Sequence, residues 1–324
     1  MRVNTNTKKD MAKFLIKCLC IPAVAIFLIF LLNKPYQKID DAKYTDLLKF
    51  TTLGNQVTHV QIANIGSSHG AYDFVYDDLT ASGYSCFNYG NTSQTFNYDY
   101  AILQEYGDYM DAGAVLFIPV SYFSFNNEVV NETEAQALSV KYYHCLSPAN
   151  MPDYDLFTDI VTTRLPILSA GEDLLELLPD WKLSIIALAA DDNIDAQEFA
   201  NRAQSRYERH FNNKASYFLP ERVSELYDII DYCKERDITP VLITTPFSKY
   251  YRDLVSEDFL EEFSSVVNEI ATQTGTAYYD YSYDDRFRGN LQYFSDSDHL
   301  NEEGAAYFMQ ILEQEIEELR AVIQ

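Results

Sequence analysis

The sequence predicts a three-layer α/β domain, in which helices cover both faces of a parallel sheet. Two observations carry this prediction. Beyond residue 57, short apolar runs with the composition of strands alternate with segments that have the spacing of amphipathic helices. One of these runs, Ala114–Val120, is almost continuously apolar, as expected of a strand that is buried on both faces. Strands that alternate with helices form a parallel sheet, because each helix returns the chain to the start of the next strand.

The composition excludes several classes of protein. Hydrophobic residues make up 47% of the 324-residue chain and charged residues 23%, as in a globular protein and unlike a disordered one. The chain has 24 Lys and Arg against 49 Asp and Glu, and this net charge of −25 argues against binding to nucleic acid. Its five cysteines form no Cys-x-x-Cys motif and it has only five histidines. We therefore expect no zinc or disulfide framework, no metal and no cofactor.

An apolar segment near the N-terminus predicts a membrane anchor. Residues 14–32 contain Lys17 as their only charge, and these 19 residues would span about 28 Å as a helix, close to the hydrocarbon thickness of a bilayer. The alternative is a cleaved signal peptide, but the bulky polar residues 33–37 lack the small-residue site that cleavage needs. Residues 1–13 form a basic tail that is expected to stay in the cytoplasm. The remaining chain would then be extracytoplasmic, beginning with a polar, partly helical linker at residues 33–56.

The predicted α/β domain covers residues 57–324. Its strands are expected at Val57–Ile65, Tyr84–Tyr89, Ala114–Val120, Pro240–Thr245 and Ala277–Tyr281. Its helices are expected at Ala71–Leu79, Phe96–Met110, Glu221–Arg236, Glu257–Thr272 and from Glu302 to about Val322. Residues 121–216 interrupt the alternation, and we predict a largely helical insertion there, between the third and fourth strands. This insertion is expected to serve as a lid, a docking surface for a partner or a membrane-facing patch.

A short turn after the first strand carries the first candidate catalytic residue. The sequence Gly-Ser-Ser-His-Gly at residues 66–70 follows a strand and opens a helix, so the hydroxyl of Ser68 is expected to be exposed. Backbone N–H groups at the start of the helix face the same space and suit a developing oxyanion. The same pattern also occurs in turns that only cap a helix. His69 is expected to start the helix rather than to catalyse.

A second motif precedes the last helix. Asp296 and His299 are three residues apart, so a single turn of chain can bring the carboxylate against the imidazole. Such a pairing fixes the tautomer of the histidine and stabilises the imidazolium that forms when the histidine accepts a proton from serine. Loops that follow parallel strands share one edge of the sheet. We therefore expect the turn at Ser68 and this loop to meet in one cleft.

Together, the two motifs resemble those of the SGNH/GDSL hydrolase superfamily. The resemblance implies a flavodoxin-like sandwich in which Ser68 is the nucleophile, His299 the base and Asp296 the residue that orients the base. Residues 88–95 resemble the second block of the family, Asn-x-x-x-x-Gly-x-Thr. Ser93 stands where that block has its glycine, and its backbone N–H is the implied oxyanion donor.

Other residues of the implied oxyanion site depart from the family pattern. Asn91, inside the second block, is an implied binding residue. The third block, Gly-x-Asn-Asp, is absent, and Pro-Val-Ser-Tyr occupies residues 119–122. Ser121, or Asn126 from the following loop, is the expected substitute for the missing side-chain donor. Loss of one such donor costs about 3 kcal/mol of transition-state stabilisation.

The turn at Ser68 also matches the motif Gly-x-Ser-x-Gly, which forms the nucleophile elbow of α/β-hydrolases. Two features argue against that fold. The turn follows the first strand rather than a strand deep in the sheet, and the acid and the histidine lie three residues apart rather than on separate loops.

The anchor and the motifs together resemble envelope acyl-transfer proteins, such as the D-alanyl transfer protein of teichoic acid synthesis and alginate O-acetyltransferase-like proteins. The resemblance implies a polytopic membrane-bound O-acyltransferase as a partner. We expect a membrane-anchored serine O-acyltransferase or esterase that acts on an extracytoplasmic cell-envelope glycan through an acyl-enzyme on Ser68. The alternative, motivated by the missing third block, is a catalytically silent scaffold or glycan-binding protein.

Overall fold

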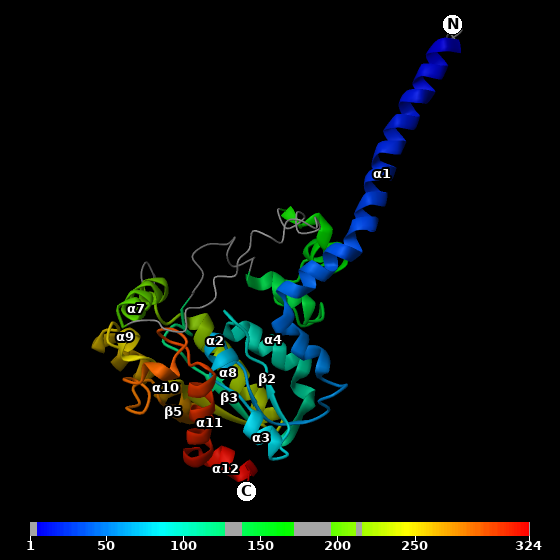
Figure 1. Cartoon of the computed structure of the whole chain (residues 1–324). Coiled ribbons are helices and arrows are strands. Elements are labelled where there is room, and N and C mark those ends of the chain that lie inside the picture. The colour runs from blue at the N-terminus through cyan, green and yellow to red at the C-terminus, as the bar shows by residue number, and fades with distance from the viewer. Residues whose placement is uncertain (1–4, 127–137, 172–195, 212–215, 324) are drawn as a thin grey trace. The chain divides into compact units, whose positions relative to one another are not determined.

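The computed structural model describes residues 5–126, 138–171, 196–211 and 216–323 (Figure 1). The chain divides into two compact units. The larger unit comprises residues 46–139, 145–152 and 190–324, and the smaller one residues 1–45, 140–144 and 153–189. Each unit is described by itself.

A five-stranded parallel sheet forms the centre of the larger unit. Its strands are β1 (Val60–Asn64), β2 (Cys86–Asn88), β3 (Met110–Pro119), β4 (Thr239–Thr244) and β5 (Ala277–Asp280). They follow the order β2-β1-β3-β4-β5, and every neighbouring pair is parallel. The chain passes from β1 to β2 on one side and then back to β3 on the other, so the strand order reverses between β1 and β3. In such sheets, ligands bind at the carboxyl ends of the strands at this reversal.

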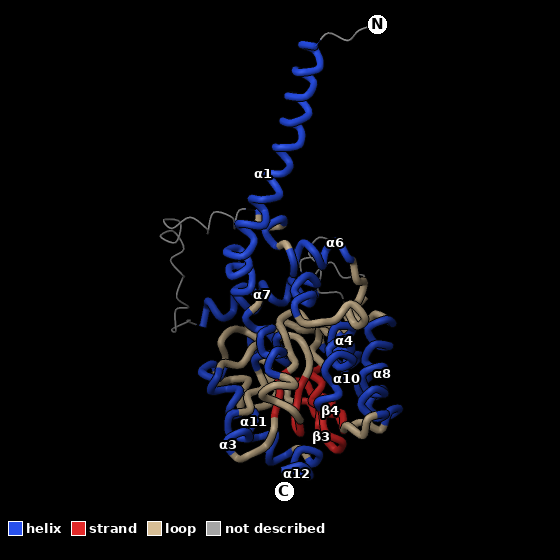
Figure 2. The backbone as a smooth tube through the Cα atoms, turned by 90° about the vertical axis from the view of Figure 1, so that its right-hand side faces the viewer, coloured by secondary structure: helices blue, strands red, loops and turns tan. Residues whose placement is uncertain are grey.

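Helices cover both faces of the sheet, which confirms the predicted three-layer α/β fold (Figure 2). One face carries α4 (Phe96–Tyr106), α8 (Pro220–Glu235) and α10 (Glu257–Thr274). The other face carries α3 (Asp77–Ala81), α11 (Glu302–Glu315) and α12 (Glu317–Ile323). Alternate strand residues point to opposite faces, so a strand between two helical layers must be apolar at every position. Leu116 and Phe117, neighbours on β3, are both 0% exposed.

The helix predicted over residues 71–79 is wrong as a single element. The structure has α2 (Ser68–Tyr72) and α3 instead, with a break at Asp73 and Phe74. The carboxylate of Asp73 accepts a hydrogen bond from the backbone N–H of Leu300 at 3.0 Å, and the carbonyl of Phe74 accepts one from the Asn88 side chain at 3.0 Å. These tertiary bonds draw the two residues into the core, where both are buried.

Two other helices differ from the sequence prediction: one ends early and one is divided. Helix α4 stops at Tyr106, because β3 already begins at Met110. The final helix is broken at Ile316, whose backbone is extended (φ −84°, ψ 117°) and whose side chain is fully buried. In both places, packing against the sheet takes precedence over helical spacing.

Part of the predicted linker belongs to the larger unit. Residues Thr45–Thr52 form a 3-10 helix that buries Leu47 and Phe50. The ring of Phe50 stacks on Tyr106 of α4 with ring centroids 4.8 Å apart. The α/β unit therefore begins at Asp46, before the first strand, because the two apolar side chains of this 3-10 helix complete its core.

The described parts of the predicted insertion contain several helices and belong to both units. The smaller unit receives a 3-10 helix (Lys141–His144), α6 (Leu156–Asp159), a π-helical turn (Ile160–Arg164) and a second 3-10 helix (Pro166–Leu168). The larger unit receives α7 (Ala196–Phe211). Residues 121–216 are thus not one separate body. The apolar clusters of the sequence at residues 174–181 and 185–190 lie outside the described residues.

The N-terminal helix α1 (Thr5–Lys43) is longer than the predicted anchor at residues 14–32. Its portion Lys17–Lys43 has a mean hydropathy of 2.0 in its most apolar stretch, of which only 6% is buried. This helix is long and apolar enough to cross a membrane. Insertion into a bilayer, and the cytoplasmic placement of the N-terminus, remain predictions.

Candidate active site

Ser68 lies on a tight turn at the carboxyl end of β1. The turn needs glycine at position 66, whose φ of 112° is a conformation that side chains rarely adopt. Its backbone N–H donates to the buried carboxylate of Asp99 at 2.7 Å, which ties the turn to α4. Burial raises the pKa of Asp99 to about 7. Asp99 was not among the residues predicted from the sequence, although an Asp on the apolar face of a helix indicates a buried, hydrogen-bonded carboxylate.

Two buried amides hold the rest of the turn. The Nδ2 atoms of Asn64 and Asn88 both donate to the carbonyl of Gly70, at 2.7 Å and 2.9 Å. Gly70 also packs against β1 so closely that a Cβ there would lie 2.2 Å from the carbonyl oxygen of Ile65. The start of α2, and with it Ser68, is therefore fixed relative to the sheet.

The loop before α11 brings the predicted acid and base together. One carboxylate oxygen of Asp296 accepts the backbone N–H groups of Asp298 at 3.1 Å and His299 at 2.9 Å, which closes the loop into a turn. The same carboxylate lies 2.8 Å from Nδ1 of the His299 ring. Asn301 then caps α11, because its side chain accepts the N–H of Gly304 at 2.9 Å.

The two predicted motifs meet, although they are 231 residues apart. Oγ of Ser68 lies 2.7 Å from Nε2 of His299, within the reach of a hydrogen bond. Because Asp296 can only accept at Nδ1, that nitrogen carries the proton and Nε2 is free to accept the hydroxyl proton of Ser68. Ser68, His299 and Asp296 therefore form the geometry of a Ser-His-Asp triad.

A pocket of about 760 Å³ opens beside Ser68. Ser68 is half-buried at its base, and His299 is 6% exposed. The wall includes Tyr72, whose ring meets the His299 ring edge to face with centroids 5.8 Å apart. Arg209 of α7 also lines the pocket, although it is more than a hundred residues away from Tyr72 in the sequence. The pocket is thus built from the turn, the loop before α11 and α7.

Two carboxylates control the charge of His299. Burial alone would lower the pKa of this imidazole, but the negative charges of Asp298 and Asp296 outweigh burial and raise the pKa to about 9. Burial alone would raise the pKa of Asp298, but His299, His69 and Arg206 hold that pKa well below its usual range. The imidazolium form of His299 is therefore strongly stabilised.

Arg206 of α7 is a site residue that the sequence analysis missed. Its Nε donates to Asp298 at 3.1 Å and its Nη2 to Asp296 at 3.2 Å. Nη2 also lies 3.5 Å from Nδ1 of His299. The guanidinium thus offsets both negative charges that surround the base. No local pattern marks this arginine, which precedes its partners by about 90 residues.

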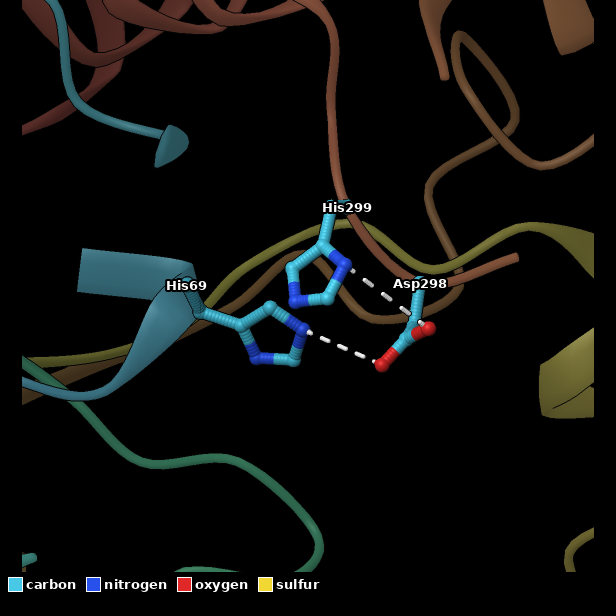
Figure 3. Close-up of side chains that lie close together, drawn as sticks. All are labelled: His69, Asp298 and His299. Atoms are coloured by element: carbon cyan, nitrogen blue, oxygen red, sulfur yellow. Dashed lines mark ion pairs between the residues drawn. The ribbon is translucent and has the colours of Figure 1, made fainter. Parts of the chain in front are cut away.

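A second histidine, His69, lies beside Asp298 and His299 (Figure 3). His69 is 0% exposed, and its Nε2 faces Asp298 at 3.7 Å, on the side of that carboxylate away from Arg206. Its Nδ1 lies 2.5 Å from Oγ of Ser121. Figure 3 shows both imidazoles directed at the one carboxylate of Asp298, which ion-pairs with each. His69 does stand in the first turn of α2, as expected, but its ring is a buried partner of the site.

Of the predicted oxyanion residues in the second block, one lines the Ser68 pocket and the other is buried beside the turn. Ser93 lines the Ser68 pocket, and its φ of 54° is in the left-handed region that glycine favours. Asn91 is buried, and its backbone N–H donates to the carbonyl of Gly66 at 3.0 Å, so it braces the turn.

Ser121 and Asn126 do not line the pocket, and both are buried at 2% exposure. The hydroxyl of Ser121 is engaged with His69, and the Asn126 side chain donates to the carbonyl of His210 at 3.3 Å. The structure therefore does not bring either expected substitute for the missing third-block donor to Ser68.

His69, Asp298 and His299 also place possible metal-ligand atoms within 4.8 Å of one another. Two of the possible donor atoms already have partners. Nδ1 of His299 is bound to Asp296, and one oxygen of Asp298 is bound to Arg206. A metal cation in this cluster would lie beside the guanidinium, so electrostatic repulsion opposes it. Nε2 of His69 and Oδ2 of Asp298 make no hydrogen bond and face each other at 3.7 Å as an ion pair.

Fold and site define an α/β protein with a Ser-His-Asp arrangement at the carboxyl edge of a parallel sheet. No protein-family model matches this chain, and no curated protein matches its sequence. Similar solved structures do exist. A proposed platelet activating factor from Streptococcus pneumoniae is 13% identical, with a TM-score of 0.43 over 90% of this chain and 98% of that one.

Two further solved structures are similar at comparable levels. An acetyl xylan esterase, AlAXEase, is 11% identical, with a TM-score of 0.39 over 79% of this chain and 100% of that chain. A GDSL-like lipase from Bacteroides thetaiotaomicron is 12% identical, with a TM-score of 0.34 over 85% of this chain and 97% of that chain.

Proposed function

We propose that this chain is a membrane-anchored serine acyltransferase or esterase that acts on an ester of an extracytoplasmic cell-envelope glycan. The observation that carries the proposal is the 2.7 Å contact between Ser68 and His299, with Asp296 held 2.8 Å behind the imidazole. A serine hydroxyl is a weak nucleophile on its own, and an adjacent base oriented by a third group is what activates it.

The reaction follows from this geometry. His299 takes the proton of the Ser68 hydroxyl at Nε2 as Oγ bonds to the carbonyl carbon of the acyl donor. The tetrahedral intermediate collapses when the ester C–O bond breaks and the imidazolium returns the proton to the departing alcohol oxygen. The acyl group is then an ester of Ser68. A sugar hydroxyl or water, deprotonated by His299, attacks this ester and restores the free serine.

The negative oxygen of the intermediate needs hydrogen-bond donors. We assign this role to the backbone N–H groups of Ser68 and Ser93. Both residues line the pocket, and the left-handed backbone at Ser93 supports its place as a substitute for glycine. With Ser121 engaged elsewhere, the oxyanion has no side-chain donor from the third block, and a modest turnover rate is expected.

The glycan and membrane parts of the proposal rest on fewer observations. The pocket of about 760 Å³ is large enough for an acylated sugar unit, and Tyr72, 47% exposed on its wall, offers a ring face for a sugar. Helix α1 supplies the anchor. An acyl donor presented by a polytopic membrane-bound O-acyltransferase would be within reach of such an anchored enzyme.

Covalent labelling tests the nucleophile. A fluorophosphonate probe should label the full-length protein in detergent, and the label should disappear in Ser68→Ala. Ser67→Ala is the matched control, because the Ser67 side chain makes no capping hydrogen bond and this variant should keep the label. Hydrolysis of p-nitrophenyl acetate should fall by at least about 10⁴-fold in Ser68→Ala. Equal labelling of Ser68→Ala and the parent protein would refute the serine mechanism and favour a silent scaffold.

A further inference from the structure

The smaller unit exposes a group of apolar side chains. Leu156 and Phe157 of α6 are 63% and 72% exposed, and Ile160 and Leu168 are 37% and 51% exposed. These four residues, here called the apolar patch, come from three consecutive helical turns within a stretch of thirteen positions. Exposed apolar side chains that are close together in the chain are typical of a contact with a partner or a membrane.

Hydrogen bonds hold the backbone around the patch at the end of the apolar part of α1. Asn33 directly follows the predicted apolar segment, and its side chain is buried. Its Nδ2 donates to the carbonyl of Arg164 at 2.8 Å, and its Oδ1 accepts the N–H of Ile167 at 3.4 Å. The 3-10 helix that ends at Leu168 packs against α1. Helix α6, labelled in Figure 2, belongs to the same unit. The patch is therefore tied to the level at which an inserted α1 would leave the hydrocarbon.

Exposed cations accompany the patch. Lys34 and Lys38 follow Asn33 on α1, and Arg164 is the residue whose carbonyl Asn33 binds; all three are exposed. Basic residues just outside an apolar span favour contact with lipid phosphates. They stand out in a chain with a net charge of −25. The same stretch also carries acidic side chains: the carboxylate of Asp155 accepts the N–H of Thr158 at 2.7 Å, and that of Asp159 accepts the Tyr154 hydroxyl at 2.7 Å.

We propose that the apolar patch inserts into the interfacial layer of the bilayer that α1 spans. The proposal rests on the membrane anchor of the proposed function and adds a second, peripheral contact with the same lipid surface. Apolar side chains beside cations are the composition of segments that lie in a membrane interface. A single helix alone would leave the smaller unit free to tilt, whereas a lipid-embedded patch beside α1 fixes its height at the membrane surface.

Fluorescence quenching by lipids tests this contact in the full-length chain. The only tryptophan, Trp181, is first replaced by Phe, and Phe157→Trp then places a reporter in the patch. Because Phe157 is 72% exposed, the larger ring has room. The protein is reconstituted in vesicles of phosphatidylcholine and phosphatidylglycerol. Lipids with a nitroxide near the headgroup should quench this tryptophan and shift its emission to the blue. A control reporter at Tyr283→Trp, 47% exposed in the larger unit, should show neither effect.

Extraction with alkaline carbonate tests separately whether α1 anchors the protein in the membrane. If the protein stays in the membrane but lipids do not quench the Phe157→Trp reporter, the patch proposal fails and the anchor stands. If carbonate releases the protein, the anchor fails and the patch proposal fails with it. A reporter that is shielded from aqueous iodide without being quenched by lipids would mean that protein covers the patch, which also overturns the lipid assignment.

Discussion

Arg206 donates from Nε to Asp298 at 3.1 Å, although the two residues are 92 positions apart. The contact joins α7, which precedes β4 in the chain, to the loop that holds Asp296 and His299. Asp298 is 1% exposed, so water does little to screen its charge. The carboxylates of Asp298 and Asp296 raise the pKa of His299, and Arg206 contacts both of them. The following predictions on pH and charge depend on this arrangement.

Activity should rise with pH up to an alkaline plateau. His299 can act as a base only when neutral, and Asp298 and Asp296 raise its pKa to about 9 against the opposing effect of burial. Below that pKa, kcat/KM for p-nitrophenyl acetate should fall about tenfold for each pH unit. The check is a pH–rate profile of the full-length protein. A profile with its midpoint near the ordinary pKa of histidine would show that the two carboxylates do not control the base.

Removing the charge of Arg206 should move this profile further toward alkaline pH. In Arg206→Gln, the two carboxylates lose a cation that lies 3.1 Å and 3.2 Å away. We expect the pKa of His299 to rise by about one unit and kcat/KM at neutral pH to fall about tenfold. Arg206→Lys keeps the charge and should shift the profile less. A loss of activity with an unchanged midpoint in Arg206→Gln would mean that the arginine has a purely structural role.

Asp298→Asn should shift the profile in the opposite direction. The substitution keeps the shape of the side chain but removes the negative charge between His69 and His299. The pKa of His299 should then fall by at least about one unit, so that the apparent pKa in the pH–rate profile falls as well. This prediction fails if Asp298→Asn and Arg206→Gln move the midpoint in the same direction.

Gly70→Ala should destabilise the turn that carries Ser68. A Cβ at this position would lie 2.2 Å from the carbonyl oxygen of Ile65, which belongs to the backbone and cannot move independently of β1. We expect the free energy of unfolding to fall by more than about 2 kcal/mol in urea denaturation. Gly289→Ala is the matched control, because nothing lies within 4 Å of a Cβ there. Comparable stability of the two variants would contradict the close approach at Gly70.

Local patterns in the sequence predicted most of the larger unit. Apolar strands and amphipathic helices each depend on neighbouring residues, so the five strands appear where their composition indicates. The break at Asp73 and the division of the last helix at Ile316 were missed, because hydrogen bonds and burial from distant segments cause them. The pairing of Asp296 with His299 was predictable from a separation of three residues.

Only the tertiary structure decided two contacts of the site. These are the contact of Ser68 with His299 and the contact of Arg206 with Asp298. By itself, the sequence determined the fold class, the turn of the candidate nucleophile and the acid–base pair, since each depends on residues close together in the chain. Which side chains of remote segments meet depends on how a twisted sheet and its helices pack. A half-buried cation from α7 and a fully buried carboxylate become partners because the buried negative charge is not stable alone, and short sequence spacing does not encode that contact.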